Sequence, residues 1–436
     1  MRQPPVRRAD GSRGRQPSDG MLAIAGVGGG PGRAAIRRLT RTGALAVLLA
    51  LAACAPLPRL APVPEAQTEQ AVIAGIPDSR VWIDRSLNEF VRMVLKDNAR
   101  EREALLREGR PVDPMPPVIF LSISGGGDNG AFAAGILSGW TASGTRPEFR
   151  VVTGISAGAL IAPFAFLGPD YDDVVRTVAT TLRPGDVFRP RNRVAGLMSD
   201  GMASSEPLRA LVRRYVTPDV LAAIAREHAK GRALEIATTD LDAGRQVTWD
   251  MGAIAASGAP GALELFRNIM VASTSIPGAV SPVMIDVSVG DRRYQEMHVD
   301  GGVITQLFAY PSHALAELEK ATGAPLNRPV HLFVIRNGRL EPEWSETPRR
   351  TLGIGGRAIG ALIQAEGVGD VHRIYRTAHQ DHVDFNLAYI GHDFPASQHP
   401  MFDTAYMNQL FDYGYRLAMK GELWHAAPPG EEGSNP

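Results

Sequence analysis

Short, unbroken apolar runs alternate with helical patterns over most of the chain after residue 117. The clearest run is Val118–Ile123, and similar runs occupy residues 150–153, 234–238 and 330–335. An unbroken run of this length is typical of a strand that is buried on both faces of a parallel sheet. Helical patterns lie between the runs, for example at Ala131–Trp140, Ala159–Phe166 and Leu208–Tyr215. The alternation predicts an α/β fold, with a mainly parallel central sheet and helices on both faces.

Two segments of different character precede this region. Residues 54–80 are proline-rich at their start, which predicts an extended, semi-rigid linker. In residues 81–116, apolar side chains recur at helical spacing from Leu87 to Leu95, which predicts an amphipathic helix. The α/β domain is expected at 117–425, followed by a flexible tail at 426–436 that is rich in proline, glycine and glutamate.

The charged residues are unevenly distributed, although 46 basic and 46 acidic side chains give a net charge of zero. Residues 1–53 contain nine arginines and two aspartates, a net charge of +7, so the remainder carries −7. The apolar run Ala44–Ala53 follows a group of these arginines and is ten residues long. A helix of that length is too short to cross a hydrocarbon core of about 30 Å. The pattern predicts a cleaved export signal over 1–53, with Met21 as an alternative start.

The only cysteine, Cys54, directly follows Leu51-Ala52-Ala53 at the end of this apolar run. A single cysteine excludes a disulfide framework and any multi-cysteine metal site. The segment resembles a bacterial lipobox, which implies that Cys54 is lipidated and becomes the first residue of the mature protein. The expected location is then the bacterial cell envelope, as a membrane-anchored lipoprotein on the periplasmic or outer-membrane side. An ordinary cleaved signal with a chance cysteine is the alternative.

The first chemical motif is Gly154-Ile155-Ser156-Ala157-Gly158, between a predicted strand and a predicted helix. A serine on such a tight turn is exposed at the carboxyl edge of the sheet, and the glycines avoid clashes within the turn. The motif favours a nucleophilic Ser156 on a nucleophile elbow that needs Gly154 and Gly158. A glycine-rich turn that holds a helix cap is the alternative.

Two further motifs flank this elbow in the sequence. Ser124-Gly125-Gly126-Gly127-Asp128-Asn129-Gly130 follows the first predicted strand and lacks the end of a P-loop and the spacing of a dinucleotide site. Its backbone N–H groups could bind an anion, such as the oxyanion of an acyl intermediate; a tight turn is the alternative. Asp300-Gly301-Gly302 follows His298-Val299, and alone it would be interpreted as an Asx-type turn.

In this order, the three motifs resemble those of the patatin-like phospholipase family, with softer likeness at 236–244 and 272–278. The resemblance covers roughly residues 117–340 and implies a three-layer α/β/α fold. It also implies a Ser156–Asp300 dyad without a catalytic histidine, with Gly125, Gly126 and Gly127 in the oxyanion hole. Asn129 departs from the arginine or lysine that is usual in the family, which puts a preference for anionic head groups in doubt.

The expected function is therefore hydrolysis of lipid acyl esters, by a phospholipase, lysophospholipase or esterase that needs no cofactor and no metal. The expected partners are a lipid substrate and the membrane, and nucleic acid is not expected. The alternatives are a non-enzymatic envelope lipoprotein that binds lipid or a protein partner, and a Ser-His-Asp esterase. A metal site formed by His372, His379 and His382 with Asp370, Asp381 and Asp384 is disfavoured against a solvated helix end. The glycine-rich stretch 353–360 predicts a flexible loop or a closely packed helix.

Overall fold

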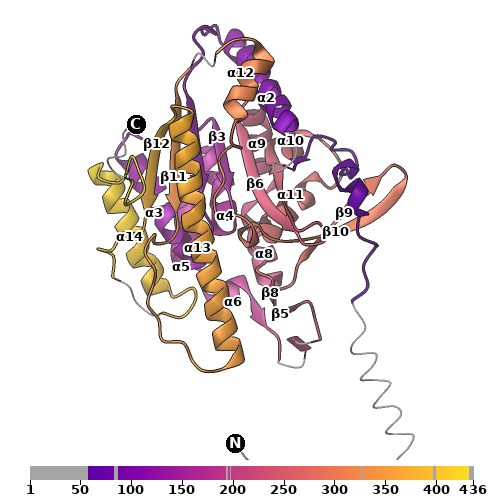
Figure 1. Ribbon diagram of the computed structural model, residues 1–436, viewed down its shortest axis with the longest axis vertical. Coiled ribbons are helices and arrows are strands. Elements are labelled where there is room, and N and C mark those ends of the chain that lie inside the picture. The colour runs from indigo at the N-terminus through magenta and orange to yellow at the C-terminus, as the bar shows by residue number, and fades with distance from the viewer. Residues whose placement is uncertain are drawn as a thin grey trace, which may run out of the picture. The chain divides into compact units, whose positions relative to one another are not determined.

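The centre of the molecule is a nine-stranded sheet whose middle strands are parallel (Figure 1). The structure is a computed structural model that describes residues 57–82, 87–192, 195–196, 198–325, 328–395 and 399–431. Five parallel strands occur in the spatial order β6-β3-β2-β11-β12. Their bounds are Ala233–Asp240 for β6, Val151–Gly154 for β3, Val118–Ile123 for β2, Val330–Arg336 for β11 and Asp384–Tyr389 for β12.

Antiparallel strands extend the sheet on the β6 side. β7 pairs with β6, β1 pairs with β7, and the hairpin of β9 and β10 joins the sheet where β10 pairs with the end of β6. A second, three-stranded sheet has the order β4-β5-β8. The bounds are Arg80–Val81 (β1), Arg245–Asp250 (β7), Val283–Val289 (β9), Arg292–Asp300 (β10), Arg189–Pro190 (β4), Gly201–Ser204 (β5) and Gly278–Val280 (β8).

Helices cover both faces of the central sheet. The α-helices are α2 (Leu87–Arg107), α3 (Gly130–Ala142), α4 (Ala157–Leu167), α5 (Asp172–Thr181), α6 (Pro184–Val187), α8 (Glu206–Tyr215), α9 (Pro218–Ala229), α10 (Met251–Ala256), α11 (Ala262–Ser273), α12 (Ala314–Thr322), α13 (Thr351–Gln380) and α14 (Thr404–Lys420). Short 3₁₀ turns occur at Glu65–Gln70, Gly127–Asn129, Pro169–Tyr171 and Gly301–Val303.

The two faces of the sheet contribute to separate cores. On β2, Leu121 and Ile123 belong to the core formed with α3, α4 and α14, whereas Phe120 belongs to the core under α13. This follows from the alternation of side chains along a strand. The fold is thus an α/β/α arrangement with a mainly parallel central sheet, as the sequence pattern predicts.

The described parts of two predicted segments, residues 57–80 of the linker and 426–431 of the tail, are packed rather than free. The part of the predicted linker that is described, from Leu57 to Arg80, buries Val63, Ile73 and Ile76 in the main core, so it is not a spacer. In the predicted flexible tail, Glu431 accepts a hydrogen bond from His372 Nδ1 at 2.9 Å, and Pro428 is buried. Both segments stay on the domain because they bury apolar side chains there.

The glycine-rich stretch 353–360 is helical and lies in α13, so the prediction of a flexible loop is wrong. The predicted export signal and Cys54 lie outside the described residues. Within the described residues, no helix combines the length and the apolar character needed to cross a bilayer.

Candidate active site

The register of strand β6 brings two distant segments together. Gly154, at the end of β3, pairs with Ile236, and Asp300, at the end of β10, pairs with Thr238. β7 pairs with one edge of β6 over most of its length, up to Asp240, so β10 must pair with the opposite edge, which β3 also uses. β10 therefore continues the sheet beside β6 beyond the point where β3 ends. The residues that follow β3 are therefore neighbours of Asp300, although 144 positions separate Ser156 from Asp300 in the sequence.

Ser156 lies on a tight turn between β3 and α4. Its φ of 53° and ψ of −121° are an unfavourable conformation for a residue with a side chain, which only a tightly packed turn maintains. A Cβ on Gly158 would lie 2.2 Å from the carbonyl oxygen of Ile123, and one on Gly154 would lie 2.6 Å from that of Gly158. The turn therefore requires both glycines, as the motif predicts.

The hydroxyl of Ser156 donates a hydrogen bond directly to Asp300, with 2.7 Å between Oγ and Oδ2. The other carboxylate oxygen of Asp300 accepts a hydrogen bond from the Gly302 N–H at 2.8 Å. Ser156 is partly exposed, whereas Asp300 is buried. Burial raises the pKa of Asp300 to about 7, against the hydrogen bonds from Ser156 and Gly302, which lower it.

The last residue of α11, Ser273, and the turn that follows it position both members of this pair. The N–H of Ser156 donates to Ser273 Oγ at 3.0 Å, and Ser273 Oγ in turn donates to the carbonyl of Ala237 at 2.7 Å. The N–H of Asp300 donates to the carbonyl of Ser275 at 2.9 Å. Residues 272–278 resemble a segment of the patatin-like family, but the sequence assigns Ser273 and Ser275 no role, because their contacts exist only in the folded chain.

The glycine-rich loop lies against Ser156. A Cβ on Gly125 would lie 3.1 Å from the Ser156 Cβ. The N–H of Gly125 donates to the carbonyl of Gln306 at 3.3 Å, so this predicted oxyanion donor is already engaged. In the part of the chain that the structure describes, the N–H groups of Gly126, Gly127 and Ala157 donate to no acceptor. These three N–H groups, in the glycine-rich loop and directly after Ser156, are therefore free to donate to another acceptor.

Asn337, which follows β11, holds the glycine-rich loop in place. Its N–H and its side-chain amide donate to the hydroxyl and the carbonyl of Ser124 at 2.7 and 2.9 Å. Its Oδ1 accepts from the N–H of Ala133 at 3.1 Å, in the first turn of α3. A Cβ on Gly126 would lie 2.3 Å from the Asn337 carbonyl oxygen, so only glycine fits there. Sequence reasoning missed Asn337; its position directly after an apolar strand was the available signal.

Gln306 links the glycine-rich loop to the segment after Asp300. Its side-chain amide donates to the carbonyl of Gly302 at 2.8 Å, while its carbonyl accepts from Gly125. Its own N–H donates to Asp370 Oδ2, on α13, at 2.6 Å. Burial raises the pKa of Asp370 to about 6. Helix α13 thus supports the site from the outer layer, a role that the sequence does not reveal.

The far side of the loop contacts the first turn of α14 and the segment before it. Asn129 Oδ1 accepts a hydrogen bond from the Tyr406 hydroxyl at 2.7 Å, and Asp128 Oδ2 accepts one from the N–H of Phe402 at 2.8 Å. The ring of His399 stacks on Tyr406, with 3.5 Å between ring centroids. Asn129, which departs from the family pattern, thus has a neutral hydrogen-bond partner here.

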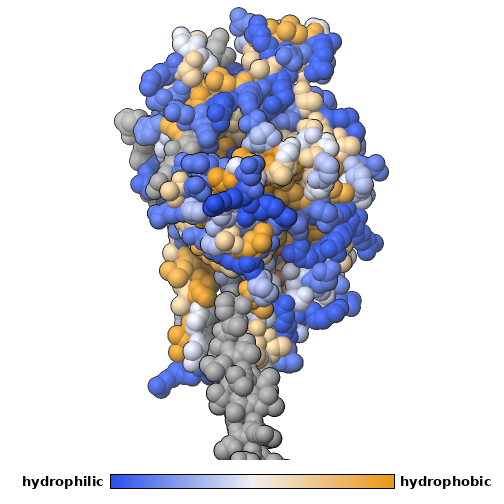
Figure 2. Space-filling model, turned by 90° about the vertical axis from the view of Figure 1, so that its right-hand side faces the viewer, coloured by the Kyte–Doolittle hydropathy of each residue, from blue (hydrophilic) through white to orange (hydrophobic). Residues whose placement is uncertain are grey.

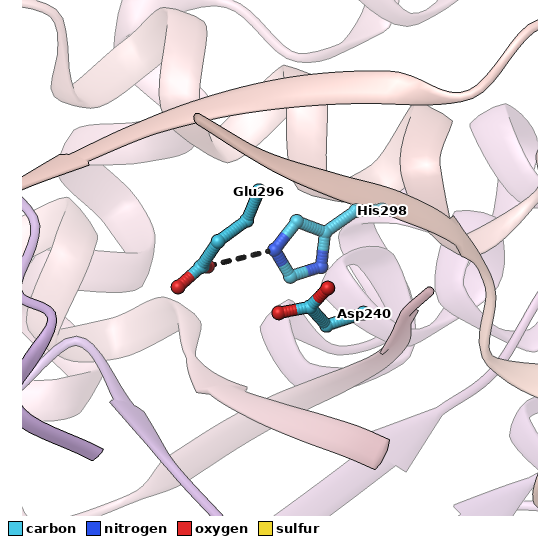
Figure 3. Close-up of side chains that lie close together, drawn as sticks. All are labelled: Asp240, Glu296 and His298. Atoms are coloured by element: carbon cyan, nitrogen blue, oxygen red, sulfur yellow. Dashed lines mark hydrogen bonds and ion pairs between the residues drawn. The ribbon is translucent and has the colours of Figure 1, made fainter. Parts of the chain in front are cut away.

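A second buried polar cluster contains Asp240, Glu296 and His298, near Asp300 on the same strands (Figure 3). His298 Nε2 lies 3.1 Å from Glu296 Oε2, and His298 Nδ1 lies 2.9 Å from Thr238 Oγ1. Arg80 forms a two-pronged ion pair with both oxygens of Glu296. A metal ion here would have to displace Arg80 and break the His298 hydrogen bonds. His298, Glu296, Thr238 and Arg80 are thus joined by hydrogen bonds, whereas Asp240 Oδ1 accepts from the N–H groups of Asp242 and Ala243.

None of the ten histidines is hydrogen-bonded to Ser156 in the described part of the chain. Two of the candidate metal ligands have other partners. His372 contacts Glu431, and Asp384 contacts His331 at 2.7 Å, and neither of these partners belongs to the candidate metal set. Among the described residues, Asp240, Glu296 and His298 are the only group of three close enough to share a metal ion.

The fold and the site define an α/β protein with a serine–carboxylate pair at the carboxyl edge of its sheet. Residues 121–310 match the model of the family "Patatin-like phospholipase". The match covers a little less than half of the chain, so a patatin-like region lies within the α/β domain.

Other comparisons are more distant. The crystal structure of VipD from Legionella pneumophila is similar with a TM-score of 0.35 and 10% sequence identity. The similarity covers 70% of this chain and 66% of that one, slightly less than two thirds of its length. A search of curated proteins found no match.

Proposed function

We propose that the protein is a serine acyl hydrolase that cleaves lipid acyl esters through Ser156 and Asp300. The observation that carries this proposal is the direct 2.7 Å hydrogen bond from the Ser156 hydroxyl to a buried carboxylate. A carboxylate can act as a general base when it contacts the reacting hydroxyl and is partly desolvated. Asp300 meets both conditions.

In the proposed reaction, Asp300 takes the hydroxyl proton as Ser156 Oγ attacks the ester carbonyl. The carbonyl oxygen becomes an oxyanion, which accepts hydrogen bonds from the free N–H groups of Gly126, Gly127 and Ala157. The leaving alcohol then receives the proton from Asp300, and an acyl group remains on Ser156. Water attacks this acyl-enzyme with Asp300 again as base, which releases a fatty acid and restores the serine.

The assignment is tested with a fluorophosphonate probe and a short p-nitrophenyl ester. The wild-type chain should be labelled and active, whereas Ser156→Ala should be neither. The variant should unfold at the same temperature as wild type, because the Ser156 side chain is partly exposed and contributes little packing. Residual activity above about one per cent of wild type would contradict the assignment, because loss of a nucleophile removes far more than that. A wild-type chain that the probe does not label would favour the non-enzymatic lipoprotein.

We also propose that the mature protein is tethered to the bacterial cell envelope through lipidated Cys54. The support is the lipobox-like segment Leu51–Cys54 after the short apolar run. Cys54→Ser should abolish incorporation of labelled fatty acid and move the protein from the membrane fraction to the soluble fraction, because several acyl chains are needed for a stable anchor. A variant that still incorporates fatty acid would contradict the lipobox assignment.

A further inference from the structure

Helix α13 has two parts with different surroundings. In its C-terminal part, Val371, Ile374, Tyr375 and Ala378 are buried in the core that includes β11 and β12. In its N-terminal part, none of the described side chains from residue 351 to 363 is buried. The N-terminal part therefore contributes no side chain to the core. The packing of the domain does not explain why this part carries apolar side chains.

The exposed part of α13 projects past the carboxyl edge of the sheet. α13 ends at Gln380 and packs beside β12, which begins at Asp384, so helix and strand run in opposite directions. The helix has 30 residues, or about 45 Å, and the strand has six, or about 20 Å. The N-terminal half of the helix therefore extends beyond the edge at which Ser156 lies, toward the lower end of Figure 1.

This projecting half has an apolar side. Ile354, Ala358 and Leu362 follow one another at four-residue spacing, and Ile359 and Ile363 lie beside them around the helix. The exposed fractions are 53% for Ile354, 51% for Ile359 and 70% for Leu362. Figure 2 keeps the vertical direction of Figure 1 and shows hydrophobic side chains gathered at its lower left.

The charged residues within the projecting half of α13 and directly before it are basic, whereas Glu343 and Glu346 lie beside Trp344 and Glu366 lies further along the helix. Residues 347–365 contain three arginines, Arg349, Arg350 and Arg357, and no aspartate or glutamate. All three arginines are exposed. Trp344, in the loop before the helix, is 87% exposed. An exposed tryptophan next to an apolar and basic helix is the composition of segments that lie in a lipid interface.

We propose that the N-terminal half of α13, together with Trp344, binds the surface of an anionic lipid bilayer. The apolar side would enter the boundary between head groups and acyl chains, and the arginines would pair with the anionic head groups. The proposal rests on the proposed function, because a hydrolase of lipid esters has its substrate at such a surface. The helix and Ser156 lie at the same edge of the sheet, so binding would bring the site to the lipid.

A single fluorophore tests contact directly. In a full-length Cys54→Ser background no other cysteine is present, so L362C can be labelled with an environment-sensitive dye. Vesicles that contain phosphatidylglycerol should shift its emission to the blue, and brominated acyl chains should quench it. The matched control is L106C, on α2, where Leu106 is 57% exposed; its label should not respond. A label at position 362 that stays unquenched while the protein sediments with vesicles would overturn the proposal.

Affinity is tested with I354Q/I359Q/L362Q in the same background. Glutamine keeps helix propensity, and the replaced side chains are exposed, so folding should not change. Partitioning onto anionic vesicles should fall at least tenfold, since burying one such side chain alone is worth about tenfold. L106Q/M419Q, at exposed positions of α2 and α14, should bind as the parent does. R349Q/R350Q/R357Q should lose the preference for anionic over neutral vesicles.

Hydrolysis of a soluble, monomeric ester separates this proposal from the proposed function. I354Q/I359Q/L362Q should hydrolyse that ester at the parent rate, and Ser156→Ala should bind vesicles as the parent does. If the parent hydrolyses no ester but its label enters the bilayer, only the proposed function fails. If the 362 label responds to protein concentration without lipid, and the triple substitution abolishes a dimer instead of vesicle binding, the surface binds a second copy and this proposal is wrong.

Discussion

Glu296 and Asp300 lie four residues apart on β10, point to the same side of the sheet and are both buried, yet their surroundings differ. Glu296 forms an ion pair with the guanidinium of Arg80. Burial opposes ionisation of Glu296, but the hydrogen bond from His298 and this ion pair lower its pKa to about 2. Asp300 has only a hydroxyl and an N–H as partners, and burial raises its pKa to about 7. One carboxylate is permanently charged, whereas the other can gain and lose a proton near neutral pH.

This difference in pKa suits Glu296 to a structural role and Asp300 to a role in catalysis. A group that exchanges a proton near the working pH is suited to acid–base catalysis. A carboxylate held by a buried arginine and a histidine is suited to fixing strands, and its network joins β10 to β6 and to the N-terminal segment through Arg80. The four predictions below test the separation, from the largest expected effect to the smallest.

Asp300→Asn should reduce kcat/KM for a soluble ester by about a thousandfold or more, because the amide cannot accept the serine proton. Its stability should not fall. Between pH 4 and 7 the folded chain keeps a proton on Asp300 that the unfolded chain releases, so stability falls as pH rises through that window. At pH 8, Asp300→Asn should therefore unfold at the wild-type temperature or above it. A stable and active Asp300→Asn would refute the dyad.

Glu296→Gln should show the reverse pattern. It leaves Arg80 buried without its charge partner, which typically costs about 3–5 kcal/mol of folding free energy. The pKa of Glu296 is lowered to about 2, so its stabilising effect is present above the ordinary carboxyl range and disappears as pH falls toward 2. Denaturant unfolding at pH 7 measures the loss. The fraction that stays folded should hydrolyse ester at nearly the wild-type rate; a stable but inactive variant would place Glu296 in the chemistry.

The pH profile sharpens the comparison further. If ionised Asp300 is the base, kcat/KM should fall about tenfold per pH unit below an apparent pKa near 7 and level off above it. Glu296 is ionised throughout this range and should contribute no inflection. Profiles are measured with an ester whose own hydrolysis is subtracted at each pH. An inflection near 4 would show that Asp300 is less desolvated than its burial indicates.

His298→Ala should have the smallest effect on activity. His298 contacts Glu296 and Thr238 but not Ser156, so kcat/KM should stay within about threefold of wild type in the folded protein. Stability should fall by about 1–3 kcal/mol, because Thr238 and Glu296 each lose a buried hydrogen bond. If this variant, or the alanine variant of any other histidine, is as inactive as Ser156→Ala, a histidine triad replaces the dyad.

The sequence predicted the layered fold well because its signals are local. The strands at 118–123, 150–153, 234–238 and 330–335 are each observed within a few residues of their predicted bounds. They are recognisable because strands buried on both faces must be continuously apolar. The elbow was recognisable for a similar reason, since the clashes that require Gly154 and Gly158 arise within a few residues of the turn or at the strand beside it.

Other parts of the molecule have no local signal. Residues 54–80 were predicted as an extended linker, but the described part from Leu57 onwards packs on the domain, because Val63, Ile73 and Ile76 contact residues that are distant in the sequence. The glycines of 353–360 suggested a flexible loop or a closely packed helix, but they lie in the exposed half of a 30-residue helix whose other half packs in the core. The supporting residues Ser273, Gln306 and Asn337 are ordinary in the sequence and acquire their roles only through long-range hydrogen bonds.

The sequence by itself determined four of the central strands, their alternation with helices and the exposed serine turn, and the resemblance to patatin-like phospholipases named Asp300 as the candidate partner of Ser156. Only the tertiary structure decided that Ser156 and Asp300 touch, because their contact depends on the register of β3 and β10 along β6. It also decided which carboxylate on β10 titrates near neutral pH. The pKa of a buried carboxylate depends on whether a cation contacts it. For Glu296 this cation is Arg80, which comes from a distant segment of the chain, so no pattern of neighbouring residues reveals it.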